Sequence, residues 1–252
     1  MSVEVLGVRI DVVSRREAME RAVGFLQGEG IHTIFTPNPE MIIAAQKDGY
    51  FKRILNRGAL NLCDGQGIAL IFKWKKNQPL ERITGVDFMK DICAYAEKYG
   101  FSVYLLGAGI DETIKQAAEK LKTEFPSLRI AGFHPGPRLE NPVNAKLKYL
   151  SNDNEAVIGD IVLTQPDILF VGFGHGKQEK YIAENMDKLR GVKISMGVGG
   201  AFDIISGRLK RAPKFLRILS LEWFWRLIQE PRRWKRIWTA VVIFPLKFIF
   251  QK

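Results

Sequence analysis

Two hydrophobic patterns alternate along most of the chain. Short runs rich in β-branched and aromatic residues are typical of strands, and longer amphipathic stretches between them are typical of helices. The pattern predicts strands over residues 3–13 (with a turn near Gly7), 32–36, 60–63, 101–106, 129–133, 168–171 and 193–196. It predicts helices from Ser14, where a capping box with Glu17 begins, to about residue 27, and over 41–47, 67–74, 87–99, 113–125, 143–150 and 177–189.

Strands that alternate with longer helices indicate βαβ units, in which consecutive strands run parallel. The runs 103–106 and 168–171 are apolar throughout, which is typical of strands that are covered on both faces. We therefore expect an α/β fold, with a mainly parallel sheet between two layers of helices. Ligands bind such sheets beyond the carboxyl ends of the strands. The segments at those ends are residues 36–38, 64–67, 107–109, 172–176 and 197–200.

The pattern changes after Gly207. Residues 214–229 are mostly apolar and aromatic, Pro231 interrupts them, and basic residues then interleave with Trp234 and Trp238. The formal net charge is +11, and the segment 208–252 holds most of it, with 12 of the 38 basic residues but only 2 of the 27 acidic ones. Four of the five tryptophans also lie there. We expect an α/β body over residues 1–207 and a helical, basic and aromatic C-terminal appendage over residues 208–252.

The composition of the appendage fits three kinds of surface. Aromatic and basic side chains together can bind nucleic acid. Tryptophan, bulky aliphatic and basic side chains together are typical of a segment that lies in the interface of an anionic membrane. A core helix with a charged rim is the third interpretation. Bulky aliphatic residues, such as those at 241–244, favour the membrane. No stretch reaches the roughly 20 apolar residues that span a bilayer, because Pro245 and Lys247 interrupt the nearest one.

The remaining composition limits the class of protein. Hydrophobic residues make up 46% of the 252 residues and charged residues 26%, which is typical of a globular protein. The two cysteines, Cys63 and Cys93, lie among apolar neighbours, so we expect a reducing cytosol and no disulfide framework. The first residues include Glu4 and Asp11 and have no basic region before an apolar run, so we expect no signal peptide.

The glycine-rich turns do not match the common nucleotide-binding motifs. After Gly107-Ala108-Gly109, the position of the third glycine in the dinucleotide-binding motif is occupied by Glu112. After Gly172-Phe173-Gly174, the same position is occupied by Lys177. Gly176-Lys177 lacks the other residues of a Walker A motif. These turns are first of all strand-to-helix connections, and phosphate binding is the second interpretation. NAD and ATP enzymes are therefore poorly supported.

Metal chemistry is also poorly supported. The three histidines, His32, His134 and His175, are far apart in the sequence. The chain has no His-Glu-x-x-His motif and no Asp-x-Asp pair. We therefore expect neither a metal nor another cofactor.

Three polar groups lie at the expected ligand-binding edge. Asp64 follows an apolar strand, and it is either a turn residue with local hydrogen bonds or a general base whose pKa is raised by partial burial. The segment Thr36-Pro37-Asn38-Pro39-Glu40 either caps a helix or also binds an anion at the helix N-terminus. Arg82 lies just before a helix cap at residues 84–87, and it is either solvated or a ligand-binding cation.

Several segments resemble the motifs of the bacterial WecG/TagA/CpsF glycosyltransferases. They occur in the family's order across nearly the whole chain, and the set is highly specific. The segments are Thr36-Pro37-Asn38, Asp64-Gly65-x-Gly67, Arg82-x-Thr84-Gly85-x-Asp87, Leu105-Leu106-Gly107, Lys177-Gln178-Glu179-Lys180, Gly197-Val198-Gly199-Gly200-x-Phe202-Asp203, Arg211-Ala212-Pro213 and Leu221-Glu222-Trp223-x-x-Arg226-Leu227-x-x-Glu230-Pro231-Arg232-Arg233. Two positions depart from the family: Gly176 replaces a usual proline, and Cys63 precedes Asp64.

The resemblance implies a Rossmann-like α/β body with a C-terminal appendage that meets the membrane. It implies an inverting, metal-independent transfer of a sugar from a UDP-sugar to an acceptor linked to a lipid diphosphate. The best-known members attach N-acetylmannosamine (ManNAc) to N-acetylglucosamine (GlcNAc) on undecaprenyl diphosphate, in the linkage unit of wall teichoic acid. Others transfer N-acetylmannosaminuronic acid, glucose or glucuronic acid. We expect UDP-ManNAc as the donor, with the other three UDP-sugars as alternatives.

The resemblance also implies roles for nine residues. Asp64 matches the family's catalytic base. The residues that match its substrate-binding set are Thr36, Asn38, Arg82, Asp87 and Gln178. Arg226, Arg233 and Arg236 match arginines that fold over the active site. Three guanidinium groups can neutralise a diphosphate without a metal.

The expected partners are the UDP-sugar, the polyprenyl-diphosphate-linked acceptor and an anionic membrane surface, without nucleic acid. We expect the protein in the cytoplasm, peripheral on the inner face of the cell membrane. The oligomeric state stays open, although parallel-sheet bodies often form homo-oligomers. Two non-catalytic classes are the alternatives. A membrane-surface scaffold would need no carboxylate at the sheet edge, and a nucleotide-binding regulator would need no membrane-binding appendage.

Overall fold

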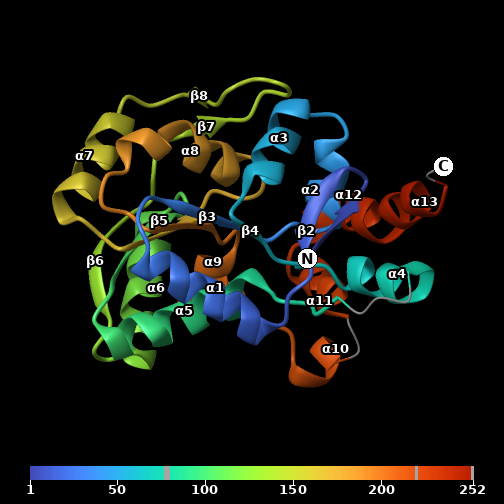
Figure 1. Cartoon of the computed structure of the whole chain (residues 1–252), viewed down its shortest axis with the longest axis horizontal. Coiled ribbons are helices and arrows are strands. Elements are labelled where there is room, and N and C mark those ends of the chain that lie inside the picture. The colour runs from blue at the N-terminus through green and yellow to red at the C-terminus, as the bar shows by residue number, and fades with distance from the viewer. Residues whose placement is uncertain (77–79, 219–220, 251–252) are drawn as a thin grey trace.

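A six-stranded parallel sheet forms the centre of the molecule in the computed structural model, which describes residues 1–76, 80–218 and 221–250 (Figure 1). Helices lie on both faces, which confirms the expected Rossmann-like α/β fold. The strand order across the sheet is β4-β3-β10-β9-β5-β6. The strands are β3 (His32–Phe35), β4 (Leu60–Asn61), β5 (Ser102–Gly107), β6 (Arg129–His134), β9 (Ile168–Gly172) and β10 (Ile194–Gly197).

Successive residues of the central strands enter two different cores. In β5, Val103 and Leu105 pack on one face of the sheet, and Tyr104 and Leu106 pack on the other. The first core includes α1 (Arg15–Gln27), α5 (Gly85–Tyr99), α6 (Asp111–Glu124) and α9 (Ala201–Ser206). The second core includes α2 (Pro39–Ala45), α3 (Gly49–Arg57), α7 (Asn154–Thr164) and α8 (Lys177–Asn185). The runs 103–106 of β5 and 168–171 of β9 are apolar throughout, as is typical of strands whose two faces are both covered.

Local capping sets where the site-bearing helices begin. Ser14 and Glu17 form the expected capping box of α1. Asn38 accepts a hydrogen bond from the Met41 N–H at the start of α2, with Pro39 as its first residue. Thr84 caps α5 in the same way. These caps satisfy backbone N–H groups that lack a partner within the helix, and so they fix where each helix begins.

Several elements differ from the sequence pattern. The first strand is an antiparallel hairpin of β1 (Ser2–Val5) and β2 (Val8–Asp11), which turns at Gly7 as expected. Helices α3, α7 and α9 were not expected. The start of α3 does have a sequence signal, because Asp48 caps it and apolar residues follow at helical spacing.

The helix expected over residues 143–150 is wrong. This segment belongs to a ribbon in which β7 (Leu139–Glu140) pairs antiparallel with β8 (Lys148–Tyr149). The buried Lys180 ammonium donates hydrogen bonds to the carbonyl oxygens of Pro142 (2.9 Å) and Ala145 (3.0 Å). Asn144 has a left-handed φ of 57°. Partners from α8 therefore satisfy backbone groups that a helix would have used internally.

The appendage continues from Gly207, whose φ of 88° ends α9. It contains α10 (Lys214–Ile218), α11 (Glu222–Gln229), a 3-10 turn (Pro231–Arg233), α12 (Trp234–Trp238), a π-helical turn (Thr239–Ile243) and α13 (Phe244–Ile249). Residues 219–220 and 251–252 of the expected appendage lie outside the described residues.

The end of the appendage packs on the body. Phe244 and Phe248 of α13 are buried in the second core. The ring of Phe248 lies 6.0 Å from that of Phe72 in α4 (Gln66–Lys76). The division of the chain into a body (1–207) and an appendage (208–252) stays a prediction. In the described parts of the chain, no helix is long and apolar enough to cross a membrane.

Candidate active site

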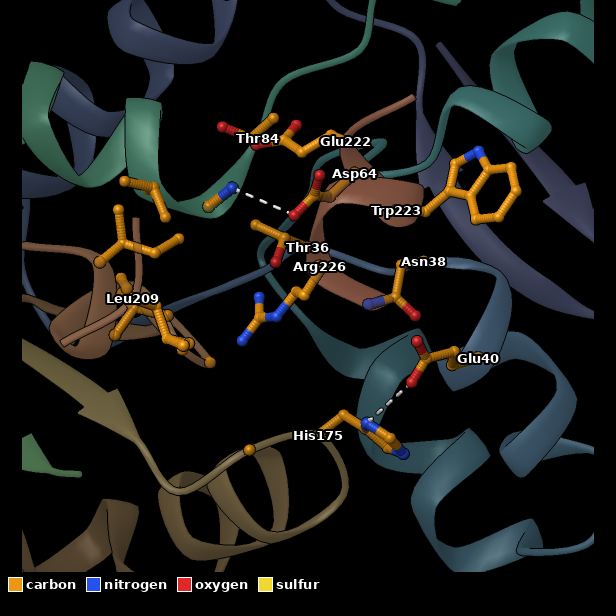
Figure 2. A pocket seen from close by; sticks show the side chains of 18 of the residues that line it. Thr36, Asn38, Glu40, Asp64, Thr84, His175, Leu209, Glu222, Trp223 and Arg226 are labelled. Carbon is orange, nitrogen blue, oxygen red and sulfur yellow. Dashed lines mark hydrogen bonds and ion pairs between the residues drawn. The ribbon is translucent and has the colours of Figure 1, made fainter. Parts of the chain in front are cut away.

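A pocket of about 290 Å³ opens at the carboxyl edge of the sheet, where the appendage crosses the strand ends (Figure 2). Its walls come from the segments after β3, β4, β9 and β10 and from α11 and α12. Eight of the nine residues predicted from the sequence line it: Thr36, Asn38, Asp64, Arg82, Gln178, Arg226, Arg233 and Arg236. Asp87 does not line the pocket.

Asp64 lies at the end of β4, with its carboxylate on the pocket wall. Its backbone N–H donates to the Pro37 carbonyl at 3.2 Å, which ties the ends of β4 and β3 together. The side chain keeps 24% of its surface exposed, and the Gly85 N–H donates to Oδ2 at 3.3 Å. Burial raises the pKa of Asp64 to about 7, although the nearby Arg82 charge opposes this rise. A carboxylate of this pKa can accept a proton near neutral pH.

Arg82 connects Asp64 with the appendage. Its Nη2 lies 3.8 Å from Asp64 Oδ1 and 2.8 Å from Glu222 Oε2 at the start of α11. All three side chains are about three-quarters buried. The guanidinium therefore bridges the body and the appendage within the pocket, and it partly neutralises the carboxylate of Asp64.

Asp87 lies behind this pocket wall. Its Oδ2 accepts hydrogen bonds from Arg211 Nη2 (2.6 Å) and Thr84 Oγ1 (2.7 Å). Burial would raise the pKa of Asp87, but the hydrogen bonds from Arg211 and Thr84 outweigh it, and the pKa falls to about 2. Asp87 thus fixes Arg211, a pocket-lining residue, against the start of α5.

Thr36 and Asn38 follow β3 and line the pocket, with Thr36 beside Asp64 and Asn38 between Asp64 and Glu40 (Figure 2). Thr36 is buried and packs closely on Gly85, where an added Cβ would lie 3.4 Å from the Thr36 hydroxyl oxygen. The Asn38 Oδ1 caps α2, so the cap and the pocket share one residue. The helix-capping interpretation of this segment is confirmed, and anion binding stays a prediction.

Gln178 lies at the start of α8, where the β9 and β10 connections meet. Its Oε1 accepts the Gly199 N–H at 2.9 Å, and its Nε2 donates to Glu179 Oε1 at 2.7 Å. The other oxygen of Glu179 accepts the Gly176 N–H at 2.6 Å. Gly176 has a φ of 82°. Proline, whose ring fixes φ near about −65° and which has no N–H, could adopt neither this conformation nor this hydrogen bond.

The three arginines of the appendage line the pocket and pair with acidic side chains. Glu230 Oε2 accepts from Arg226 Nε (3.1 Å) and Arg233 Nη1 (3.2 Å). Arg236 Nε donates to Glu40 Oε2 at 2.6 Å. Burial and the neighbouring charges of Arg226 and Arg236 lower the pKa of Arg233. The positive charges of these arginines repel one another, and a bound anion would stabilise them.

His175 completes the contact between α12 and the body. Its Nδ1 lies 2.7 Å from Arg236 Nη2 and 3.9 Å from Glu40 Oε2. Burial, together with the Arg236 charge, lowers the pKa of His175 to about 4. The imidazole is therefore neutral at physiological pH, and its Nδ1 accepts a hydrogen bond from the guanidinium.

Sequence reasoning gave no role to the acidic partners of these arginines. Glu222 and Glu230 lie inside one segment that matched the family, and Arg211 lies inside another. Nothing in their spacing indicated which oppositely charged side chain each would contact. Glu40 follows the Asn38-Pro39 cap and was noted only as part of it. Within the described ranges, no three His, Cys, Asp or Glu residues lie close enough to hold a metal ion. Metal independence stays a prediction.

Comparison with known proteins agrees with this geometry. A model of the glycosyl transferase WecG/TagA/CpsF family matches residues 3–252. A protein of Bacillus subtilis (strain 168), named N-acetylglucosaminyldiphosphoundecaprenol N-acetyl-beta-D-mannosaminyltransferase, is 37% identical over 204 residues, which cover 81% of this chain and 74% of the relative. A Staphylococcus aureus (strain MW2) protein of the same name is 29% identical over 93% of this chain and 86% of its own length. The chain therefore belongs to the WecG/TagA/CpsF family and is a glycosyltransferase.

Proposed function

We propose that this glycosyltransferase moves ManNAc from UDP-ManNAc to GlcNAc on a polyprenyl diphosphate, with inversion and without a metal. The observation that carries the proposal is the meeting, in one pocket, of a carboxylate with a pKa near 7 and a cluster of arginines from the appendage. The first can act as a base, and the second can neutralise a diphosphate.

The reaction needs a single displacement. Asp64 accepts the proton of the acceptor hydroxyl, whose oxygen forms a bond to the anomeric carbon of the donor. The bond between that carbon and the phosphate oxygen breaks, and its electron pair leaves with UDP. Attack from the face opposite the leaving group inverts the anomeric configuration. Arg226, Arg233 and Arg236 stabilise the charge that develops on the diphosphate.

The printed names of the relatives support the choice of sugars. They describe a ManNAc transferase that acts on N-acetylglucosaminyldiphosphoundecaprenol. We assign Thr36, Asn38, Arg82 and Gln178 to binding of the donor, because they line the pocket beside Asp64. Asp87 acts on the donor through Arg211, which it holds at the pocket wall. UDP-linked N-acetylmannosaminuronic acid, glucose and glucuronic acid are the alternative donors.

A lipid-linked acceptor requires the pocket to lie near a membrane surface. The appendage, which lines the pocket, exposes large apolar side chains at Phe224, Ile228, Trp234 and Trp238. Its sequence also carries most of the net positive charge. We propose that this surface binds anionic lipid on the inner face of the cell membrane, with the enzyme on the cytoplasmic side.

The function is tested with purified protein, a short-chain soluble GlcNAc-diphosphate-lipid acceptor and the four UDP-sugars in parallel. We expect UDP release with UDP-ManNAc, a product of inverted configuration by NMR, and unchanged rates in EDTA. Asp64→Asn should lower turnover by about 10²- to 10⁴-fold while UDP binding stays within a few-fold. Preference for another donor would change the sugar assignment. Transfer retained within tenfold in Asp64→Asn would remove Asp64 from the base role, and loss of activity in EDTA that Mg²⁺ restores would contradict metal independence.

A further inference from the structure

Glu179 is a buried acid that lines no part of the pocket, yet it directly contacts a residue that does. Its side chain is fully buried beside Gln178, at the start of α8. In the described part of the chain no cation forms an ion pair with it, and the neighbouring Lys180 binds Asp48 instead. Burying an unpaired acid is unfavourable unless hydrogen bonds compensate. This arrangement therefore calls for a reason other than stability.

The two oxygens of Glu179 have separate partners. Oε2 accepts the Gly176 N–H at 2.6 Å, which fixes the carboxylate against the loop before α8. Oε1 accepts from Gln178 Nε2 at 2.7 Å. Burial raises the pKa of Glu179 to about 7, while these hydrogen bonds favour the ionised form. The carboxylate is thus a hydrogen-bond acceptor that is held in place by the backbone.

Gln178 is constrained from both ends of its amide. Its Oε1 accepts the Gly199 N–H at 2.9 Å, and its Nε2 donates to Glu179. A flip of the amide would place an NH₂ group against the Gly199 N–H and a carbonyl oxygen against the carboxylate. The contact with Gly199 would be repulsive because two donors would face each other, and the contact with the ionised Glu179 carboxylate would be repulsive because two acceptors would face each other. The Gln178 amide therefore has one orientation.

The space around this amide is equally restricted. A Cβ added to Gly197 would lie 2.7 Å from Gln178 Nε2, so the amide packs directly on the backbone of β10. An amide nitrogen carries two hydrogens, and Glu179 uses one of them. Among the described residues no second acceptor binds this nitrogen, so its other hydrogen is available to a ligand in the pocket that Gln178 lines.

We infer that Glu179 is a positioning residue, which fixes the Gln178 amide so that it offers an N–H, and not a carbonyl oxygen, to the donor substrate. The group that fits this N–H is an oxygen acceptor, such as a diphosphate oxygen or a sugar hydroxyl or acetamido oxygen. The inference rests on the proposed function, because it requires that Gln178 contacts the donor.

A double-mutant cycle tests this inference with the full-length chain. The variants are Glu179→Gln, Gln178→Ala and the double substitution, and the readouts are KM and kcat for UDP-ManNAc with the soluble acceptor. A glutamine at position 179 keeps the shape of the side chain, but it cannot accept hydrogen bonds from both Gly176 and Gln178. We expect Glu179→Gln to lower kcat/KM by about tenfold or more in the wild-type background and by less than about twofold in the Gln178→Ala background.

Two further variants keep the test interpretable. Glu184→Gln removes another acid of α8, which binds Tyr50 and the Leu147 N–H outside the pocket, and it should leave KM and kcat unchanged. Glu179→Asp keeps the charge but shortens the reach. If the melting temperature shows that Glu179→Gln does not fold, Glu179→Asp takes its place in the cycle.

The outcomes separate this inference from the proposed function. The positioning role would be overturned if folded Glu179→Gln and Glu179→Asp had wild-type kinetics. It would also be overturned if the loss of kcat/KM in the position-179 variant added to that of Gln178→Ala. Neither result would affect the assignment of Asp64 or of the reaction. Wild-type kinetics in Gln178→Ala would overturn the donor contact of Gln178 and this inference with it. Absence of UDP-sugar transfer by the wild-type chain would instead reject the proposed function itself.

Discussion

At the residue scale, Asp64 is balanced between two opposing effects. Burial favours its neutral form, whereas the Arg82 guanidinium at 3.8 Å and the Gly85 N–H favour its ionised form. Burial is the larger effect, and so the pKa reaches about 7. A carboxylate with this pKa is ionised in a large share of molecules near neutral pH and still binds a proton well. The same environment has consequences for rate and for stability.

The first prediction concerns rate and pH. If Asp64 is the base, kcat/KM should fall about tenfold for each pH unit below an apparent pKa near 7, because only the ionised carboxylate accepts the acceptor's proton. The measurement is UDP release with the soluble acceptor between pH 5 and 9. A profile that stays flat down to pH 5.5 would contradict this assignment.

The second prediction concerns stability and pH. The pKa of Asp64 is higher in the folded chain than the ordinary value of 3.8, so the unfolded state loses its proton first. The free energy of unfolding therefore falls as the pH rises from about 4 to 7, and the loss is complete above 7. Asp64→Asn avoids this loss, and we expect it to raise the melting temperature by about 5 °C at pH 8 and by less at pH 5.

Thermal melting of Asp64→Asn and of the wild-type chain in matched buffers measures this difference. Asp87 offers a comparison of opposite sign, because hydrogen bonds lower its pKa to about 2. Asp87→Asn should lower the melting temperature at pH 8. Equal melting temperatures for Asp64→Asn and wild type at pH 8 would show that burial of Asp64 does not reduce stability.

At the scale of elements, the turn between β10 and α9 and the helix α11 form one wall of the pocket together. A Cβ added to Gly200 would lie 2.6 Å from Arg226 Nη2, so the guanidinium approaches the backbone where a side chain would otherwise be. Gly200 has a φ of −86°, which lies outside the left-handed region that favours glycine. Glycine is therefore needed at this position to make room for the Arg226 guanidinium, and not to allow the backbone conformation.

The third prediction follows from that contact. Gly200→Ala should displace the Arg226 guanidinium from the pocket wall and lower kcat/KM for the UDP-sugar by about tenfold, because the proposed contact of Arg226 with the diphosphate is lost. The fold should be retained, since the backbone conformation suits alanine.

Gly159→Ala in α7 is the matched control, because no heavy atom lies within 4 Å of its added Cβ. Gly159→Ala should leave activity unchanged, and the higher helix propensity of alanine should stabilise the chain by about 0.5–1 kcal/mol. Wild-type kinetics in Gly200→Ala would show that the Arg226 contact is not needed for transfer.

At the scale of the whole molecule, the appendage covers the pocket and carries an exposed apolar surface. The last appendage helices, α12 and α13, lie toward one end of the long axis in Figure 1, and α7 lies at the other. Trp234 and Trp238 are 57% and 56% exposed, and exposed basic residues lie beside them at Arg232 and Lys235. Exposed tryptophan next to basic side chains is the composition that binds membrane interfaces.

The fourth prediction tests this surface with vesicles. The wild-type chain should sediment with vesicles of phosphatidylglycerol and phosphatidylcholine, and less at high salt or without the anionic lipid. Replacing Trp234 and Trp238 together with serine should weaken the partitioning by about tenfold or more, because apolar burial is lost. Leu163→Ser in α7, at a site that is 83% exposed, is the control and should bind like wild type. Undiminished binding of the double variant would place the membrane contact elsewhere.

The sequence by itself determined where the six strands of the sheet lie along the chain, the carboxyl edge at which the pocket opens, and the position of Asp64 on it. These features depend on short-range physics: the spacing of apolar residues, helix caps such as Asn38, and turn residues. The Gly65-x-Gly67 turn after an apolar strand indicated the edge position of Asp64, and residue matches to a known family indicated the arginines.

Only the tertiary structure decided which charges meet. Arg82 pairs with Glu222 and Arg236 with Glu40 across separations of 140 and 196 residues, which no local pattern encodes. The same holds for the ribbon at residues 139–149, where Lys180 from α8 satisfies carbonyl groups that a helix would have used. Desolvation, which raises the pKa of Asp64 and Glu179, likewise exists only once the chain has closed around them.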